Sequence, residues 1–134
     1  MDMILYSHAI ASLGGYAILM IVLTALSAAG RSDDERALCG QVKRDYANPT
    51  YRKARAHANA VESAGPFIAA VVAAIMMGAA PFWVNLFASV FLTARIVMAY
   101  VHIGTTNQPM RSVFWTISML CVLALAVMAI WRIF

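Results

Sequence analysis

The sequence predicts an all-α integral membrane protein built as a bundle of four transmembrane helices. Of its 134 residues, 63% are hydrophobic and only 12% are charged, and the mean hydropathy is +0.76. A soluble domain of this length cannot bury so much apolar surface. Four apolar segments each come close to the ~20 residues that a helix needs to cross the hydrocarbon core. Because a helix satisfies its own backbone hydrogen bonds in lipid, we expect a helix at each of them.

The expected spans belong to a single membrane domain, residues 1–134, and cover residues 4–29, 56–80, 81–103 and 112–131. A short uncharged turn at residues 78–82 makes the second and third spans antiparallel. Pro49 marks a turn before the second helix, because the residue before a proline avoids the helical region. Pro109 also interrupts the chain, so the fourth helix is expected to start at Met110 or Arg111.

The polar segment at residues 30–55 is predicted to be a cytoplasmic loop. It holds seven of the ten Lys and Arg residues, and an excess of these residues marks cytoplasmic loops. Four spans then place both termini outside, and in a bacterium the membrane would be the inner one. The net charge of +4 gathers beside apolar spans. This placement indicates contact with membrane lipid rather than with nucleic acid, for which the sequence has no motif.

The cysteines and histidines predict no metal site. Cys39 and Cys121 form no CxxC pattern and are interpreted as a loop thiol and a small core residue. His57 and His102 lack the i, i+4 spacing of a metal site on a helix.

The most informative segment is the polar start of the second span. Arg55, Asn59 and Glu62 project from one helix face, within roughly 60° of one another. Ionisable groups at membrane depth are costly and usually mark function. A cation, an amide and a carboxylate on one face suit a small zwitterion that has carboxylates and an ammonium of its own.

Other polar residues lie toward the cytoplasmic ends of the third and fourth spans. Arg95 and His102 are seven residues apart, so they share one face of the third helix. Arg111, Ser112 and Trp115 open the fourth span. We expect these residues and those of the second span to line one pocket that opens near the cytoplasmic leaflet.

A purely structural explanation of the same residues competes with this pocket. Glu62 and Arg95 are opposite charges on hairpin partners and can neutralise each other, which would lock the bundle without binding anything. Arg55 and Arg111 can be anchors whose charged ends reach the lipid headgroups. The clustering of these cations with Asn59 at one depth favours the pocket.

Three segments carry a resemblance to a known family: Arg55-Ala-His-Ala-Asn-Ala-Val-Glu62 with Pro66-Phe67, then Arg95, then Pro109-Met-Arg-Ser-Val113. In these segments the chain resembles the membrane-associated proteins in eicosanoid and glutathione metabolism, the MAPEG family. It is most similar to the branch of microsomal prostaglandin E synthase and microsomal glutathione transferase. The resemblance covers residues 38–134. The first span resembles that of the family only in being an apolar segment.

The resemblance implies a homotrimer of four-helix subunits, with glutathione bound between neighbouring subunits near the cytoplasmic side. The positions that match the family's glutathione contacts are Arg55, Asn59, Glu62, Arg95, Arg111 and Ser112. In the loop, Gln41 and either Lys43 or Arg44 are weaker candidates.

The sequence departs from the prostaglandin synthase at four positions of this pocket. Met98 stands where that enzyme has His, His102 and Trp115 where it has Tyr, and Ala58 where it has Arg. We include His102 and Trp115 among the expected glutathione-binding residues. Because these changes reshape the pocket, the prostaglandin isomerase activity is not carried over.

The expected function is that of a membrane-bound, glutathione-dependent transferase, peroxidase or both, acting on a lipophilic electrophile. Arg111 would stabilise the glutathione thiolate, and Ser112 would donate a hydrogen bond to the sulfur. One alternative is a non-enzymatic lipid-binding or adaptor protein of the same fold, as five-lipoxygenase-activating protein is. Another is an ion or proton carrier using Glu62, His57 and His102, although polar groups near one side give no path across the membrane.

Overall fold

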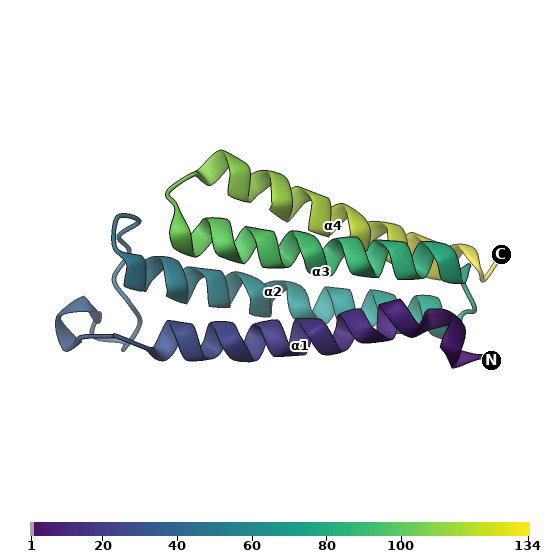
Figure 1. The fold of residues 1–134 in the computed structure, drawn as a ribbon, viewed down its shortest axis with the longest axis horizontal. Coiled ribbons are helices and arrows are strands. Elements are labelled where there is room, and N and C mark those ends of the chain that lie inside the picture. The colour runs from purple at the N-terminus through teal and green to yellow at the C-terminus, as the bar shows by residue number, and fades with distance from the viewer. Residues whose placement is uncertain (1) are drawn as a thin grey trace.

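Four long helices make up most of the chain in the computed structural model, which describes residues 2–134 (Figure 1). They are α1 (Ser7–Ala28), α2 (Pro49–Met76), α3 (Pro81–Gly104) and α4 (Gln108–Trp131), with short 3₁₀ turns η1 (Met3–Tyr6) and η2 (Asp33–Glu35). All four helices are long and apolar enough to cross a membrane, and the described residues contain no strand. The predicted all-helical membrane fold is therefore confirmed, and the chain is an integral membrane protein.

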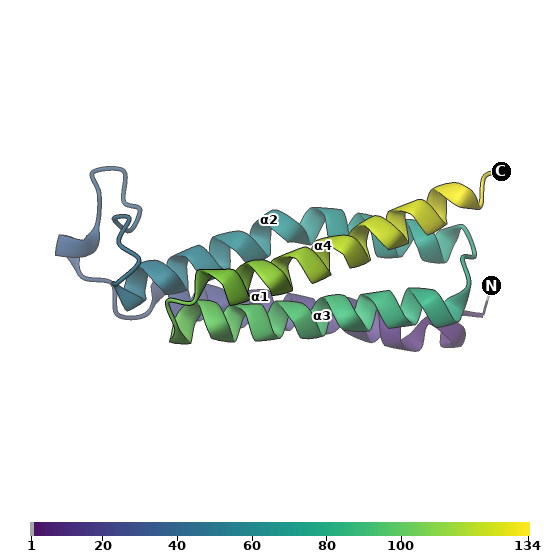
Figure 2. The ribbon, with the colours of Figure 1, turned by 90° about the horizontal axis from the view of Figure 1, so that it is seen from above.

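The helices alternate in direction, so the polar loop and the chain termini lie at opposite ends of the bundle (Figure 1). Helix α1 packs against α2 and α3, and α4 packs against the same two helices from the other side (Figure 2). The start of α2, the end of α3 and the start of α4 thus share one end of the molecule with the loop. This is the end at which the sequence places its polar residues.

Helix α2 begins at Pro49, two turns before the predicted span at residue 56. The Asn48 side chain caps it by accepting a hydrogen bond from the Thr50 N–H at 2.7 Å. Pro49 fits the first turn because its missing N–H has no helical partner there. The helix therefore carries its basic first turns beyond the apolar part of the span.

Helix α4 begins at Gln108, so the predicted start at Met110 or Arg111 is two or three residues too late. Asn107 is the capping residue and accepts a hydrogen bond from the Met110 N–H at 3.0 Å. Pro109 lies in the first turn, where proline is tolerated, and does not interrupt the helix.

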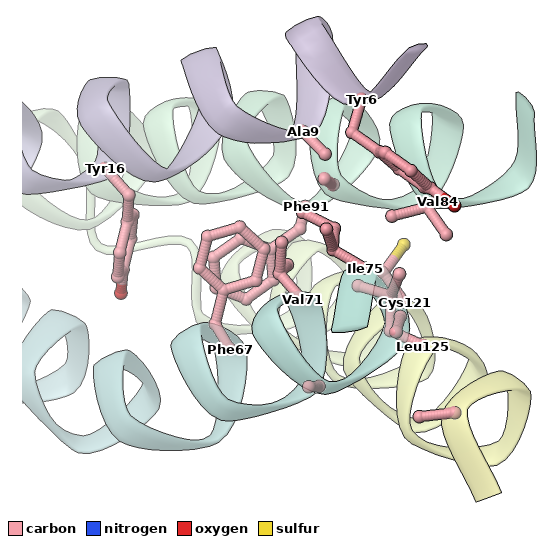
Figure 3. Packing of buried hydrophobic residues seen from close by; sticks show 14 of the residues in the cluster. Tyr6, Ala9, Tyr16, Phe67, Val71, Ile75, Val84, Phe91, Cys121 and Leu125 are labelled. Carbon is pink, nitrogen blue, oxygen red and sulfur yellow. The ribbon is translucent and has the colours of Figure 1, made fainter. Parts of the chain in front are cut away.

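Three aromatic rings hold α1, α2 and α3 together near the middle of the bundle (Figure 3). Phe67 and Phe91 stack with ring centroids 3.8 Å apart, and Tyr16 meets both rings edge-on at 5.5 and 5.1 Å. The Tyr16 hydroxyl donates to the Ala60 carbonyl oxygen at 2.7 Å. This bond fixes α1 against the turn of α2 that carries the polar residues.

Pro66 lies in the interior of α2, on its exposed side. Proline has no N–H, so it cannot donate to the carbonyl of Glu62, four residues earlier. The turn that carries the Glu62 side chain thus also carries a backbone acceptor without its usual helical donor.

Candidate functional site

Arg95 is the buried centre of the polar end, with only 3% of its surface exposed. Its Nη2 donates to the carbonyl oxygen of Asn59 at 2.7 Å and to the Asn59 Oδ1 at 2.9 Å. Its Nη1 lies 3.4 Å from the Met98 sulfur. A buried cation is tolerated only when its donors are satisfied. Here neutral acceptors on α2 and α3 provide this, rather than a carboxylate.

Glu62 pairs with Arg55, so the suggested Glu62–Arg95 pair is wrong. The Arg55 Nη1 lies 3.0 Å from the Glu62 Oε1, and the two side chains are 40% and 60% exposed. Both residues lie on the outer surface of α2, two turns apart. The face predicted to carry Arg55, Asn59 and Glu62 is therefore divided, because Asn59 turns inward to Arg95 while the charged pair turns outward.

An open cleft of about 800 Å³ lies between the loop and the outer surface of α2. Its lining includes four cationic side chains and one carboxylate, together with Gln41: the cations are Arg31, Lys43, Arg44 and Arg55, and the carboxylate is Glu62. The loop candidates from the sequence thus lie beside Arg55 and Glu62. The sequence interpretation missed Arg31, although its place directly after an apolar span was a usable signal.

Hydrogen bonds within the loop keep it folded beside the cleft. Arg36 and Val42 form an isolated antiparallel bridge, and the Lys43 N–H donates to the Glu35 carbonyl oxygen at 2.8 Å. The Glu35 carboxylate accepts from the Asn48 side-chain amide at 2.8 Å, which ties the loop to the capping residue of α2. This hydrogen bond holds the pKa of the Glu35 carboxyl below its usual value.

His102 is 2% exposed and faces the loop rather than the cleft. Its Nε2 lies 3.0 Å from the hydroxyl of Tyr46, and its Nδ1 has no hydrogen-bond partner among the described residues. The Tyr46 ring in turn lies under the guanidinium of Arg111, 5.1 Å from its centre. Sequence reasoning missed Tyr46, whose signal was an aromatic residue in a polar loop just before a helix cap.

The predicted residues of α4 do not join the α2 group within one chain. Arg111 is half-buried, whereas Ser112 and Trp115 are exposed. The Ser112 hydroxyl donates to the Gln108 carbonyl oxygen at 3.1 Å. Among residues 2–134, no hydrogen bond or ion pair connects these α4 residues to Arg55 or Glu62. In the same part of the chain, no three His, Cys, Asp or Glu side chains gather around a possible metal ion.

The whole bundle, and not only its polar end, matches a known family. A model of the MAPEG family matches residues 9–131, nearly the whole chain. The chain belongs to the MAPEG family. This family includes glutathione transferases and related enzymes, and some MAPEG members are not enzymes. No curated protein matches the chain.

The MAPEG match extends the resemblance seen in the sequence. It begins at residue 9 and so includes most of α1, whereas the sequence resemblance began at residue 38. In this MAPEG protein, α1 contributes Tyr16, whose hydroxyl bonds the carbonyl of Ala60 next to Asn59. The first span therefore supports the turn of α2 that holds Arg95.

The buried contact of Asn59 with Arg95 and the exposed Arg55–Glu62 pair should differ in how much stability is lost when each is broken. Asn59→Leu removes one acceptor from the buried Arg95 guanidinium, and we expect it to lower the free energy of unfolding by about 1.5–3 kcal/mol. Glu62→Gln weakens an exposed pair and should cost less than about 1 kcal/mol. Unfolding in a denaturing detergent series measures both. Asn59→Asp is the matched control, because it retains an acceptor and should remain folded. Equal losses for Asn59→Leu and Glu62→Gln would contradict this assignment of partners.

Proposed function

We propose that this MAPEG protein binds glutathione as a co-substrate and transfers it to lipophilic electrophiles in the membrane. The observation that carries the proposal is the cleft in which Arg31, Lys43, Arg44 and Arg55 surround a single carboxylate, Glu62. Reduction of lipid hydroperoxides by the same thiol is a second reaction of the proposed site. The likeness to the glutathione transferase branch of the family supports both.

The charges of glutathione complement those of the cleft. Glutathione has two carboxylates and one ammonium, and arginine binds a carboxylate through two parallel hydrogen bonds. Arg55 with one of the loop cations can take the two carboxylates, and Glu62 can take the ammonium. The Arg55–Glu62 pair must then open, but a pair this exposed is worth only about 0–1 kcal/mol. Glutathione can therefore replace it at little cost.

The buried residues act behind this surface in the proposal. Arg95 is enclosed by α2 and α3, and Asn59 stands between it and the outer face. We assign Asn59 as a contact and Arg95 as the cation that orients it. His102 is likewise enclosed, and it would act through Tyr46 rather than by touching glutathione.

The proposed chemistry starts with loss of the thiol proton to solvent. A cation beside the sulfur stabilises the thiolate and lowers the pKa of the thiol. We assign this role to Arg111, with Ser112 donating a hydrogen bond to the sulfur. The thiolate then attacks an electrophilic carbon, a carbon–sulfur bond forms, and the leaving group departs with its electron pair. The electrophile enters from the bilayer, past exposed α4 residues such as Trp115.

Assembly supplies what one chain lacks. The α2 group and the α4 group both face outward and do not meet within one subunit. A homotrimer, in which the outer α2 face of one subunit meets the α4 face of its neighbour, would complete the site. The excess of Lys and Arg supports a cytoplasmic position for the loop, at the inner membrane if the protein is bacterial.

A non-enzymatic lipid-binding or adaptor role is the second candidate. The observation that favours it is the enclosure of His102, which bonds Tyr46 at 3.0 Å and does not line the cleft. An adaptor would not need glutathione, so binding of glutathione separates the two functions.

Glutathione at millimolar concentration should raise the melting temperature of the protein, because a ligand that binds only the folded state stabilises it by mass action. The rise should shrink in Glu62→Gln, which keeps the shape but loses the charge for the ammonium. Differential scanning fluorimetry measures both, with S-methylglutathione as a second ligand that keeps all the charges. A melting curve that neither ligand changes would favour the adaptor role.

Arg111→Ala should slow turnover of glutathione with an aryl halide by about ten- to hundredfold, which corresponds to about 1.4–3 kcal/mol of transition-state stabilisation. Binding of glutathione should weaken far less, because the α2 contacts remain. The ultraviolet absorbance of the bound thiolate should fall in parallel, and Arg111→Lys should keep part of the rate because it keeps the charge. Equal rates for wild type and Arg111→Ala across pH would reassign Arg111 as an interfacial anchor.

Native mass spectrometry in several mild detergents should release a trimer. The reason is that the α2 and α4 groups of the proposed site do not meet within one subunit, so a neighbouring subunit has to bring them together. Comparing wild type with Glu62→Leu, which removes the exposed charge, controls for assembly driven by apolar contact alone. A monomer or dimer in every detergent would overturn the trimeric site.

A further inference from the structure

The Arg111 guanidinium lies over the ring of Tyr46. Its guanidinium carbon lies 5.1 Å from the ring centre. Among residues 2–134, no hydrogen bond or ion pair engages the Arg111 guanidinium. A flexible, half-buried arginine without polar partners samples many rotamers, so an aromatic face beneath it is the contact that restricts it.

Tyr46 is itself fixed from two helices. Its hydroxyl lies 3.0 Å from the Nε2 of the buried His102 on α3, and the two rings stack with 19° between their planes. Its carbonyl oxygen accepts from the Nη1 of Arg52 on α2 at 3.0 Å. The Arg52 Nε also donates to the carbonyl oxygen of Ile103, at the end of α3, at 3.2 Å. The ring therefore has a fixed place between the loop and the helix ends.

Contact through the ring face has a chemical consequence for Arg111. A cation–π contact holds a guanidinium through its positive charge and needs no hydrogen-bond acceptor. The ring of Tyr46 therefore orients Arg111 without a hydrogen bond to its N–H donors and without neutralising its charge. A carboxylate in the same place would fix Arg111 equally well but would cancel the positive charge that a thiolate needs.

We propose that Tyr46 is the positioning residue of this site, held by His102 and Arg52, and that it presents the Arg111 guanidinium with its donors free for the glutathione sulfur. The catalytic part of this inference rests on the proposed function, whereas the contact between Tyr46 and Arg111 does not. The inference also gives the buried His102 a role, which is to anchor the Tyr46 hydroxyl rather than to bind glutathione. The contact between Tyr46 and Arg111 joins the loop to α4, and neither residue lines the cleft on α2.

The test compares Tyr46→Phe, which keeps the ring but loses the hydroxyl, with Tyr46→Leu, which loses the ring. In full-length protein labelled with ¹⁵N-arginine and free of glutathione, the Nε–H resonance of Arg111 is identified by its loss in Arg111→Lys. Tyr46→Leu should shift this resonance most, and Tyr46→Phe, which keeps the ring but loses the bond to His102, should shift it less. Tyr100→Leu is the matched control, because Tyr100 is 77% exposed on α3. An unmoved resonance in Tyr46→Leu would overturn the contact between Tyr46 and Arg111.

Turnover then tests the catalytic part. The strength of an exposed cation–π contact implies that Tyr46→Leu lowers kcat with an aryl halide by about two- to fivefold. The KM for glutathione should stay within about twofold, and the thiolate absorbance should fall with kcat. Tyr46→Phe should lose less of both than Tyr46→Leu, because it keeps the ring but not the bond to His102. In the Arg111→Ala background, Tyr46→Leu should cause no further loss, because its effect runs through Arg111. An equal further loss would make Tyr46 merely structural and overturn the positioning role.

The two proposals fail in distinguishable ways. Wild-type protein without any turnover of glutathione would overturn the proposed function, and with it the catalytic role of Tyr46. The resonance shift would still test the contact between Tyr46 and Arg111. Turnover that is normal in Tyr46→Leu would overturn the positioning role alone. Melting curves of each variant identify a rate that falls only because less protein is folded.

Discussion

The polar end of this bundle depends on how a cation is accommodated between two helices at membrane depth. Among residues 2–134 no carboxylate pairs with Arg95, and its two Nη groups contact the carbonyl and side-chain oxygens of Asn59 and the sulfur of Met98. Such an arrangement requires the two helices to keep one register, because a shift of one residue would move both oxygens away from the guanidinium. The aromatic stack of Phe67 and Phe91 and the Tyr16 hydroxyl hold that register from the neighbouring turns.

The use of neutral acceptors for Arg95 leaves Glu62 available for the outside of the bundle. Had Glu62 turned inward to neutralise Arg95, the outer face of α2 would carry only cations. Instead, Glu62 lies with Arg55 on the surface that the loop covers, and the cleft there has both signs of charge. The internal packing of α2 against α3 thus decides the chemistry that the outer surface of α2 can offer to a ligand.

The sequence predicted the helices well because composition and length determine which segments can cross lipid. It placed the start of α4 too late, because the proline rule marks a break but does not tell whether the proline lies before the helix or in its first turn. The turn expected before α2 is confirmed, since Asn48 is the extended residue that precedes the helix. Helical periodicity put Arg55, Asn59 and Glu62 on one face, but it cannot say which of three neighbouring side chains turns inward, and the structure divides them. Tyr46 could not be found by periodicity at all, because its contacts join a loop to the ends of three helices.

Pro66 has a consequence for the hydration of the membrane around the protein. The carbonyl of Glu62 lacks its helical donor, and the Glu62 carboxylate projects from the same turn. Acyl chains offer no hydrogen-bond donor, so lipid cannot solvate this stretch of α2. Water, a headgroup, a ligand or a neighbouring chain must reach it. This side of α2 therefore cannot face acyl chains alone along its whole length, and it interrupts the apolar surface that the bundle presents to lipid.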